Sequence, residues 1–354
     1  MKKKILALLL TAAMTVGFAG CSGNNAQADN ESTTTEASDQ SEATTTEDES
    51  EATTDEASEL PDITVNVGVL SGPTGVGAAK LMNDSKNGET VLNYNFTVET
   101  ENSNIVAAVS NGELDIAAIA TNVAANLYNK TDGGVQIIAL NTLGVLYILE
   151  NGDEINSIAD LEGKTIVAPG QGANPEYVIK HLLQENGVNA TVEFMTADEV
   201  IAKMNNGEAT VCMLPVPAAT ALQMKNENVR TALDLTAEWD ALNSGSQLTM
   251  GAVVVRTEFA EQYPEVVKQF LEEYTASIEY VKTNVDESSQ LVADFGITAN
   301  AQIAANAIPQ CNLVAITGAE AIKSAIAGYY DVLYAADPAS VGGEIPGENF
   351  YFAG

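Results

Sequence analysis

The sequence predicts an α/β fold of two similar lobes with mainly parallel sheets, joined by a two-strand hinge. One observation is an internal repeat: Ile105–Tyr128 resembles Val200–Gln223, and both segments contain Asn-Gly-Glu. Another is that short apolar runs alternate with helix-like segments, which is typical of parallel strands connected by helices. A repeat of this length favours two lobes over a solenoid, which needs three or more short copies. We expect lobe 1 at residues 61–150 plus 251–354 and lobe 2 at residues 151–250.

In the first lobe, strands are predicted to alternate with helices. Val65–Leu70 is a short apolar run that ends in the glycine-rich turn Ser71–Gly75, and helix-like residues follow. Tyr94–Glu99 and Asp115–Ala120 are the next predicted strands. A helix at Ile105–Ser110 is expected between them.

In the second lobe, the same order is predicted. Thr165–Ala168 is a strand that ends in the turn Gly170–Asn174, and a helix at Glu176–Glu185 follows. Thr191–Met195 and Thr210–Leu214 are the next strands. Each lobe therefore presents turns at the ends of its strands.

Two further apolar strands, Gly144–Glu150 and Gly251–Arg256, bracket the second copy. We interpret them as the crossovers of the hinge, so that the chain enters lobe 2 and returns to lobe 1. A helix should begin at Pro264, because proline is favoured in the first helical turn, and another should lie within Ile316–Tyr334. The closing segment Asp337–Phe352 is expected to wrap lobe 1.

The N-terminal segment, residues 1–20, predicts export. Three lysines precede an apolar run, and small residues lead to Cys21. The run is too short to span a bilayer, so we expect a chain anchored by a lipid on Cys21, with an ordinary secretory signal as the alternative. Residues 21–60 are rich in Ser, Thr and acids and contain no Lys or Arg, which predicts a disordered acidic tether.

Composition excludes several classes of function. The chain has 49 acidic residues against 15 Lys and Arg, a net charge of −34, which disfavours nucleic acid and anionic lipid. Arg230 and Arg256 are the only arginines that could grip an anion. His181 is the single histidine; a metal site needs several ligands, so a surface or capping role is favoured. No catalytic set, metal site or cofactor is expected.

Four other side chains have mainly structural interpretations. Cys212 lies in a buried-strand pattern and is expected to be an inert core thiol, while its pairing with Cys311 stays open. Tyr147 could stack on a flat ligand, although core packing is favoured. Trp239 lies in a polar segment and is interpreted as a surface residue.

The binding site is predicted at the turns that follow the parallel strands, because open α/β sheets bind ligands there. Glycines in the first turn would let backbone approach a ligand closely, and helix N-termini could hold an oxyanion or a carbonyl. The predicted ligand-binding residues are Ser71, Gly72, Pro73, Thr74, Gly75, Asn102, Ser103, Thr121, Asn122, Gln171, Gly172, Asn174, Pro215 and Pro217.

Several of these residues also fit a role without a ligand. Ser71–Gly75 alone fits a tight turn, Thr121 with Asn122 fits helix capping, and Asn102 or Ser103 is a natural N-cap. Pro215–Pro217 is apolar, so lobe 2 would offer shape and stacking where lobe 1 offers hydrogen bonds.

Three features resemble the ABC-transporter solute-binding lipoproteins of the nitrate/sulfonate/taurine family, which is related to thiamine-pyrimidine binders. They are Ile158–Pro175, Gly251–Tyr274 and the Cys21 signal, and the resemblance covers nearly all of residues 61–354. It implies a type II periplasmic-binding-protein fold whose lobes close on a solute. By position in the turns, it also implies contacts from Thr74, Ser103, Thr121, Asn122, Gln171 and Asn174.

The expected function is therefore capture of a small organic solute and delivery to an ABC permease with its ATPase, without catalysis. The apolar turn at Pro215–Pro217 argues against a small inorganic anion and favours an organic solute, flat or sulfonate-like. We expect a monomer held by lipid at the extracytoplasmic face of the cell membrane of a Gram-positive bacterium. The alternative is a surface lipoprotein that feeds a sensor or acts as an adhesin. An enzyme of the pyrimidine-synthase kind would need iron-binding histidines and a Cys-rich motif, which this sequence lacks.

Overall fold

The computed structural model describes residues 60–242 and 245–354. The predicted signal segment, Cys21 and the tether lie outside the described residues. Within the described part of the chain, no helix combines the length and the apolar character that crossing a bilayer requires.

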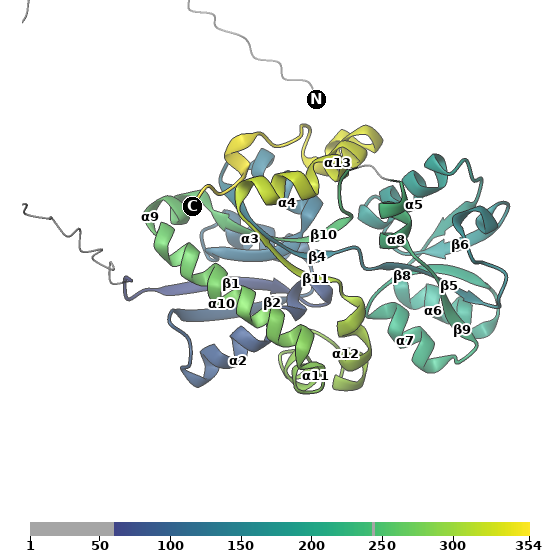
Figure 1. Ribbon diagram of the computed structural model, residues 1–354, viewed down its shortest axis with the longest axis horizontal. Coiled ribbons are helices and arrows are strands. Elements are labelled where there is room, and N and C mark those ends of the chain that lie inside the picture. The colour runs from purple at the N-terminus through teal and green to yellow at the C-terminus, as the bar shows by residue number, and fades with distance from the viewer. Residues whose placement is uncertain (1–59, 243–244) are drawn as a thin grey trace, which may run out of the picture. The chain divides into compact units, whose positions relative to one another are not determined.

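Strands and helices alternate through most of the described chain, as the apolar pattern predicts (Figure 1). The strands are β1 (Thr64–Leu70), β2 (Asn93–Glu99), β3 (Ile116–Ala120), β4 (Val135–Leu143), β5 (Leu146–Asn151), β6 (Thr165–Ala168), β7 (Thr191–Phe194), β8 (Val211–Pro215), β9 (Val229–Asp234), β10 (Thr249–Arg256) and β11 (Leu313–Thr317).

The helices cover both sheets. They are α1 (Pro73–Val76), α2 (Ala79–Asn87), α3 (Asn102–Ser110), α4 (Thr121–Lys130), α5 (Asn174–Glu185), α6 (Ala197–Asn206), α7 (Ala218–Lys225), α8 (Leu235–Ala241), α9 (Thr257–Gln262), α10 (Pro264–Thr283), α11 (Val285–Asp294), α12 (Ala301–Ala307) and α13 (Ala319–Ala336). Short 3₁₀ helices are η1 (Ile158–Leu161), η2 (Ile308–Gln310), η3 (Pro338–Val341) and η4 (Glu348–Phe350).

Two sheets organise the fold, and their strands follow the same order. The first sheet runs β11-β4-β10-β3-β1-β2, and the second runs β9-β5-β8-β6-β7. In the first sheet, β1 is parallel to β2 and β3, whereas β10 is antiparallel to β3 and β4. In the second sheet, β6 is parallel to β7 and β8, whereas β5 is antiparallel to β8 and β9. Apart from the extra edge strand β11, each sheet has the same arrangement, which confirms an α/β fold of two similar lobes.

The prediction of mainly parallel sheets is wrong in detail, because both sheets are mixed. The parallel part comprises β1, β2 and β3 in one sheet and β6, β7 and β8 in the other. The antiparallel neighbours include β4, β9 and β11, three strands that the sequence analysis did not identify. β4 follows α4, β9 follows α7 and β11 follows α12 and η2, so a preceding helix does not distinguish these strands from the parallel ones.

The chain crosses between the sheets twice, next to the strands that the sequence analysis assigned to the hinge. β4 ends at Leu143 in the first sheet and β5 begins at Leu146 in the second. The return lies between α8, which ends at Ala241, and β10, which begins at Thr249. The predicted crossover strands β5 and β10 are therefore full members of opposite sheets, and the crossings are the short segments that precede them. The strand β5, assigned on sequence to lobe 1, pairs in the second sheet.

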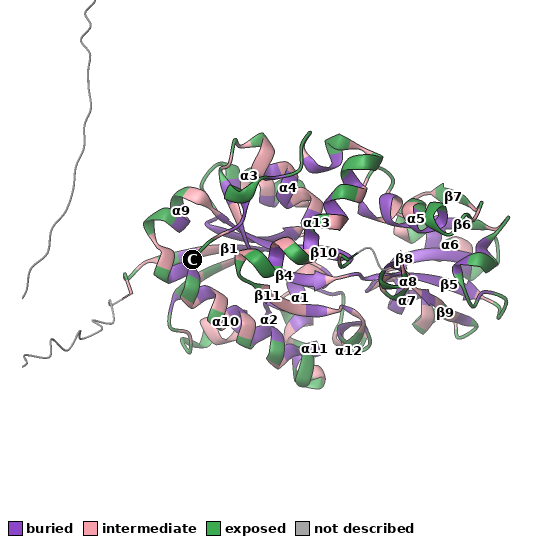
Figure 2. Ribbon diagram, turned by 45° about the horizontal axis from the view of Figure 1, so that its top comes forward, coloured by how far each residue is buried: buried purple, intermediate pink, exposed green. Residues whose placement is uncertain are grey.

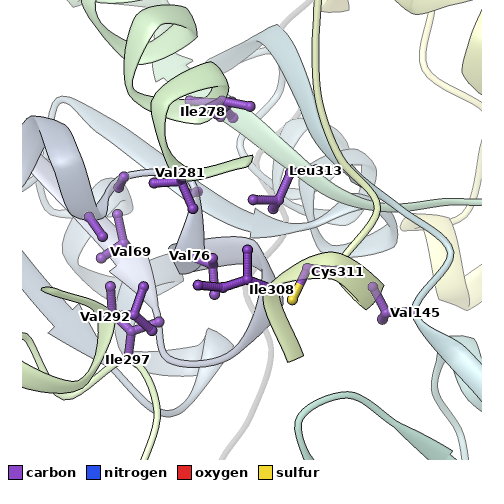
Figure 3. Close-up of a cluster of buried hydrophobic side chains, with 14 of the residues drawn as sticks. Val69, Val76, Val145, Ile278, Val281, Val292, Ile297, Ile308, Cys311 and Leu313 are labelled. Atoms are coloured by element: carbon purple, nitrogen blue, oxygen red, sulfur yellow. The ribbon is translucent and has the colours of Figure 1, made fainter. Parts of the chain in front are cut away.

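Buried apolar side chains lie on both faces of the first sheet. In β3, Ile116 and Ala118 join one core cluster, whereas Ala117 and Ile119 join the other, as the two-residue period of a strand requires. Figure 3 shows Val69 of β1 among side chains from helices on one face. Burial on both faces explains why these strands are continuous apolar runs (Figure 2).

The C-terminal segment packs on α4 and β4, which confirms the prediction that it wraps lobe 1. The side-chain amides of Asn126 and Asn129 donate to the carbonyl oxygens of Ala339 and Val341. The backbone N–H of Phe352 donates to the carbonyl oxygen of Ile137 in β4.

The surface interpretation of Trp239 is wrong. Its side chain is fully buried, with its ring centroid 5.0 Å from that of His181 and 5.8 Å from that of Tyr329. Leu235 and Trp239 lie one turn apart on α8, so one helix face carries both into the core. The polar neighbours in sequence occupy the opposite face.

Both described cysteines are core thiols. Cys212 and Cys311 are buried and free, and burial raises the pKa of each thiol to about 12. Cys212 is therefore inert, as expected.

Candidate functional site

A cavity of about 420 Å³ lies between turns of the two lobes. Its volume is within the range of small-molecule sites. It is lined by Leu70, Ser71, Gly72, Pro73, Thr74, Asn102, Ala120, Asn122, Val123, Thr142, Val145, Ala173, Asn174, Pro175, Pro215, Val216, Pro217 and Met250. These residues include the carboxyl ends of β1, β3 and β8 and residues in the first turn of α3, α4 and α5. They also include Val145 in the first crossing and Met250 close to the second. Two other hollows, of about 540 Å³ each, are lined by residues of the first lobe alone.

The turn after β1 is fixed by backbone contacts. Gly72 has φ +95°, a conformation that L side chains rarely adopt, and its N–H donates to the carbonyl oxygen of Ile297. A Cβ on Gly75 would lie 2.0 Å from the carbonyl oxygen of Leu70. Gly75 is therefore required by the turn itself and does not line the cavity. Ser71, Pro73 and Thr74 are half-buried and do line it.

The starts of α3 and α4 form the next part of the wall. The side-chain oxygen of Asn102 accepts a hydrogen bond from the N–H of Ala120 at 3.2 Å, which joins the start of α3 to the end of β3. Asn102 is the first residue of α3 and Glu101 is its N-cap, so the expected capping by Asn102 or Ser103 is wrong. Ser103 is exposed and does not line the cavity.

Thr121 and Asn122 begin α4, after the N-cap Ala120. The capping role considered for Thr121 is therefore not observed. Its side chain is fully buried, and its carbonyl oxygen accepts a hydrogen bond from the Tyr330 hydroxyl at 2.9 Å. Asn122 is half-buried and lines the cavity, whereas Thr121 does not.

The second lobe contributes two turns. Asn174 is the first residue of α5, is only 4% exposed, and its side-chain oxygen has no hydrogen-bond partner among the described residues. Gln171 and Gly172, from the same turn, are exposed and lie outside the lining. The turn Pro215–Pro217 lines the cavity with apolar groups, and the N–H of Val216 donates to the carbonyl oxygen of Val145.

The structure thus brings nine of the predicted residues to one cavity. They are Ser71, Gly72, Pro73, Thr74, Asn102, Asn122, Asn174, Pro215 and Pro217. Gly75, Ser103, Thr121, Gln171 and Gly172 are outside its lining, although each is adjacent in sequence to a lining residue or one residue removed.

Sequence reasoning missed the contribution of the crossings. Thr142 is the last residue but one of β4, Val145 lies between β4 and β5, and Met250 is the second residue of β10. In the sequence these residues look like ordinary strand residues. Only their location beside the crossings could have indicated that they line the cavity. Tyr147 packs in the core, and its hydroxyl donates to the carbonyl oxygen of Gln310 at 2.9 Å, so it does not face the cavity.

The two arginines are held in ion pairs at the other ends of the sheets. Arg256 ends β10, which is antiparallel to β3, and pairs with Asp115 at 2.8 Å. Arg230 of β9 pairs with Glu150 near the end of β5, also at 2.8 Å. Because β5 is antiparallel to β8, Glu150 lies at the amino end of β8. Neither arginine lines the cavity, which is at the carboxyl ends of β3 and β8.

Comparisons with known proteins identify the family. No curated protein sequence matches the chain. A family model described as NMT1/THI5 like matches residues 92–288, more than half of the chain. The chain belongs to the NMT1/THI5-like family.

Solved structures show that this NMT1/THI5-like chain has the fold of periplasmic binding proteins. An ABC transporter structure from Parabacteroides distasonis matches with a TM-score of 0.69 at 21% identity, over 82% of this chain and 99% of that one. The periplasmic aliphatic sulphonate binding protein SsuA from Escherichia coli matches with a TM-score of 0.63 at 15% identity, over 81% and 92%. The alkanesulfonate-binding protein SsuA from Xanthomonas axonopodis pv. citri, bound to MOPS, matches with a TM-score of 0.58 at 14% identity, over 82% and 96%.

Proposed function

We propose that this chain is the extracytoplasmic solute-binding component of an ABC importer. The observation that carries the proposal is the cavity, which is lined by turns from both lobes at the carboxyl ends of their parallel strands. The family and the similar structures, whose names include an ABC transporter and sulphonate-binding proteins, support it.

The proposed mechanism is closure of the lobes on a solute. A solute that contacts Thr74 or Asn122 in one lobe and Asn174 or Val216 in the other stabilises the closed form by its additional contacts there. The lobes, near residues 61–150 plus 251–354 and residues 151–250, would move about the two crossings. An ABC permease with its ATPase then recognises the closed protein and receives the solute.

The solute is proposed to be a small organic molecule, flat or sulfonate-like. The apolar groups of Pro215–Pro217, Val145 and Met250 suit an organic body, and sulfonate is bound by structural relatives. We propose binding without catalysis, because the hydroxyls of Ser71 and Thr74 have no histidine, carboxylate or lysine beside them in the lining.

The proposed location is the outer face of a bacterial cell membrane. Residues 1–20 would direct export, Cys21 would carry the lipid, and residues 21–60 would hold the folded part away from the bilayer. We propose a monomer from a Gram-positive organism.

The proposal is tested by solute binding and its loss in a double variant. A thermal-shift screen over sulfonates, pyrimidines, flavins and aromatic acids should yield a stabilising compound, whose affinity is then measured by calorimetry. Thr74→Ala with Asn122→Ala should weaken that affinity about 10- to 100-fold, since each removes a polar group worth roughly 1 kcal/mol. The side chains of both residues make no hydrogen bond to other described residues, so folding should be preserved.

The matched control is Ser110→Ala with Asn206→Ala, which also removes one hydroxyl and one side-chain amide, but from exposed positions outside the cavity. It should leave the affinity unchanged. Unchanged affinity in the Thr74 and Asn122 double variant would reject the site, and absence of any stabilising compound would reject the function.

A further inference from the structure

We propose that the cavity selects an uncharged organic solute that carries an amide-like edge, with a hydrogen-bond donor beside an acceptor. This inference rests on the proposed function, since it concerns the chemistry of the solute captured by the same cavity. It departs from the sulfonate-like solute that the structural relatives suggest.

The lining of the cavity is polar without being charged. Among the described residues that line it, none carries an ionisable acid or base, and the polar side chains are hydroxyls and amides. Moving a charged group from water into such a site is costly unless it meets an opposite charge. A neutral solute avoids that cost and still pairs with hydroxyls and amides.

None of the described lysine or arginine side chains belongs to the lining of the cavity. Arg230 and Arg256 pair with Glu150 and Asp115 at the amino ends of β8 and β3, away from the cavity. Lys180 is the lysine on α5, the helix that begins at the cavity, and it pairs with Glu176. An anionic solute would therefore meet no free cationic side chain in the lining.

The helix that begins at Asn174 already has an anion at its N-terminus. The carboxylate of Glu176 accepts a hydrogen bond from the N–H of Gly172 at 2.6 Å. That hydrogen bond and the one from Lys180 lower the pKa of Glu176, so its negative charge is held at the start of α5. The partial positive charge of the helix end, about half an elementary charge, is thus offset before any solute arrives.

The start of α3 is acidic as well. Glu101 is its N-cap, and Glu99 accepts a hydrogen bond from the side chain of Asn104 at 2.9 Å. With a net charge of −34 over the chain, these carboxylates repel anions that approach the cavity. The starts of α4 and α7 remain as neutral N–H donors, which suit a carbonyl acceptor.

Two buried oxygens in the lining specify the other half of the solute edge. Thr142 is fully buried and Asn174 is 4% exposed, and the side-chain oxygens of both lack a protein partner among the described residues. An unpaired buried polar group is unfavourable. The amide oxygen of Asn174 is satisfied only by a donor, whereas the hydroxyl of Thr142 is satisfied by a donor or an acceptor. Both residues line the cavity although these oxygens have almost no exposed surface, so pairing with a solute N–H requires a change of side-chain torsion, χ2 for Asn174 and χ1 for Thr142. A sulfonate or carboxylate offers acceptors alone and cannot pair with the Asn174 oxygen.

The experiment compares matched neutral and anionic probes on the full chain. The pairs are benzamide with benzoate, nicotinamide with nicotinate, and benzenesulfonamide with benzenesulfonate, each titrated by calorimetry at low and physiological salt. In each pair that binds, the neutral member should bind at least about tenfold more tightly, because only the anion must lose its hydration without a partner. Equal or tighter binding of an anion would overturn this inference and leave the proposed function standing. Absence of binding by all six probes would overturn this inference and leave the proposed function, which the wider screen tests, standing.

A charge introduced into the lining tests the cause of the preference. Met250 is half-buried, and Met250→Lys places a cation of similar length in the cavity, with Met250→Gln as the neutral control. Met250→Lys should reverse the preference toward the anionic member, and Met250→Gln should keep it. A neutral preference that persists in Met250→Lys would overturn the electrostatic explanation.

The unpaired oxygens are tested by a pair of isosteric substitutions. Thr142→Val removes a hydroxyl that lines the cavity, so it should raise the Tm of the unliganded protein and weaken amide binding about 2- to 10-fold. Thr249→Val removes an equally buried and unpaired hydroxyl that does not line the cavity, so it should raise the Tm without changing affinity. Equal affinity in the two variants would overturn the role of Thr142.

Discussion

The two lobes have the same strand order and yet contribute different chemistry to the cavity. Lobe 1 supplies Ser71, Thr74, Asn102 and Asn122 from turns after β1 and β3 and at the helix starts. At the equivalent place after β8, lobe 2 supplies the apolar turn Pro215–Pro217.

This difference between the turns of the two lobes shows that the sheets and the turns have separate roles. The strand order determines where the cavity lies, because the carboxyl ends of β3 and β8 both reach it. The residues of the turns determine what it can bind. A duplicated fold therefore needs no duplicated chemistry: most polar side chains of the lining come from lobe 1, with Asn174 from lobe 2, and the apolar turn comes from lobe 2 alone.

The lobes also differ in how each holds a buried carboxylate at the far end of its sheet. Arg256 and Asp115 form the pair in lobe 1, with side chains 20% and 8% exposed. Arg230 and Glu150 form the pair in lobe 2, with side chains 36% and 4% exposed. Both oxygens of Glu150 also accept backbone N–H groups, from Glu154 and Ile155.

The largest expected effect on stability comes from replacing the arginine of each of these two ion pairs. Arg256→Met leaves one oxygen of Asp115 without its donor, because Asn66 donates only to the other oxygen, and should cost about 3 kcal/mol of unfolding free energy. Arg230→Met leaves both oxygens of Glu150 paired with backbone and should cost about 1 kcal/mol. Urea unfolding of the two variants measures the difference.

The control for this pair is Lys268→Met, which removes a surface ion pair to Glu265 and should change stability by less than about 0.5 kcal/mol. Solute affinity should be unchanged in all three variants, because none of the substituted residues lines the cavity. A loss for Arg230→Met equal to that for Arg256→Met would contradict the contrast between the lobes.

A smaller effect tests the apolar wall of lobe 2. Val216 lines the cavity and is 1% exposed, so Val216→Thr buries a hydroxyl in an apolar setting. We expect a loss of about 1–2 kcal/mol in stability, measured by urea unfolding. Calorimetry should show a lower affinity for the solute, because the hydroxyl replaces an apolar group that would contact the apolar part of the solute.

Val200→Thr is the matched control, because Val200 is fully buried in the same lobe but outside the cavity lining. It should cost similar stability and leave affinity unchanged. If both variants bind the solute equally well, the apolar turn does not contact it.

The sequence predicted the parallel half of each lobe because those strands are short runs followed by turns and helices, and one strand of each lobe lies in the repeat. Val65–Leu70 and Thr165–Ala168 are apolar runs that end in glycine turns, and they are β1 and β6. β4 and β9 escaped prediction because their partners come from other parts of the chain. β9 pairs with β5 and β4 pairs with β10, so long-range pairing rather than local pattern makes them strands.

The site was predicted where it depends on strand ends and missed where it depends on the crossings. Asn122 and Pro217 follow strands of the repeat directly, so position alone marked them. Thr142 and Met250 reach the cavity only because the chain changes sheet beside them. Trp239 was misassigned because the polar residues of α8 occupy one face and its buried stripe is only two residues long.

The lobes also meet away from the polar and apolar walls, where α5 of one lies against α13 of the other. The hydroxyl of Tyr177 donates to the carboxylate of Asp337 at 3.2 Å. His181 packs on Trp239 and lines a hollow there with Lys180, Glu185 and Asp331. This contact contains the one histidine of the chain, so it is where a pH effect near neutrality should arise.

The smallest expected effect is therefore a pH dependence from His181. Burial lowers the pKa of His181 below 6.5, and Glu185 only partly opposes that shift. As pH falls through 6.5, the unfolded chain binds a proton before the folded chain does, so stability falls until the folded pKa is passed. His181→Phe keeps the ring on Trp239 without titration, and its Tm should exceed that of the wild type by a margin that grows between pH 7.5 and pH 5.5. A margin that stays constant or shrinks over this range would show that protonation of His181 does not destabilise the folded protein. The contact between α5 and α13 would then be insensitive to the charge of His181.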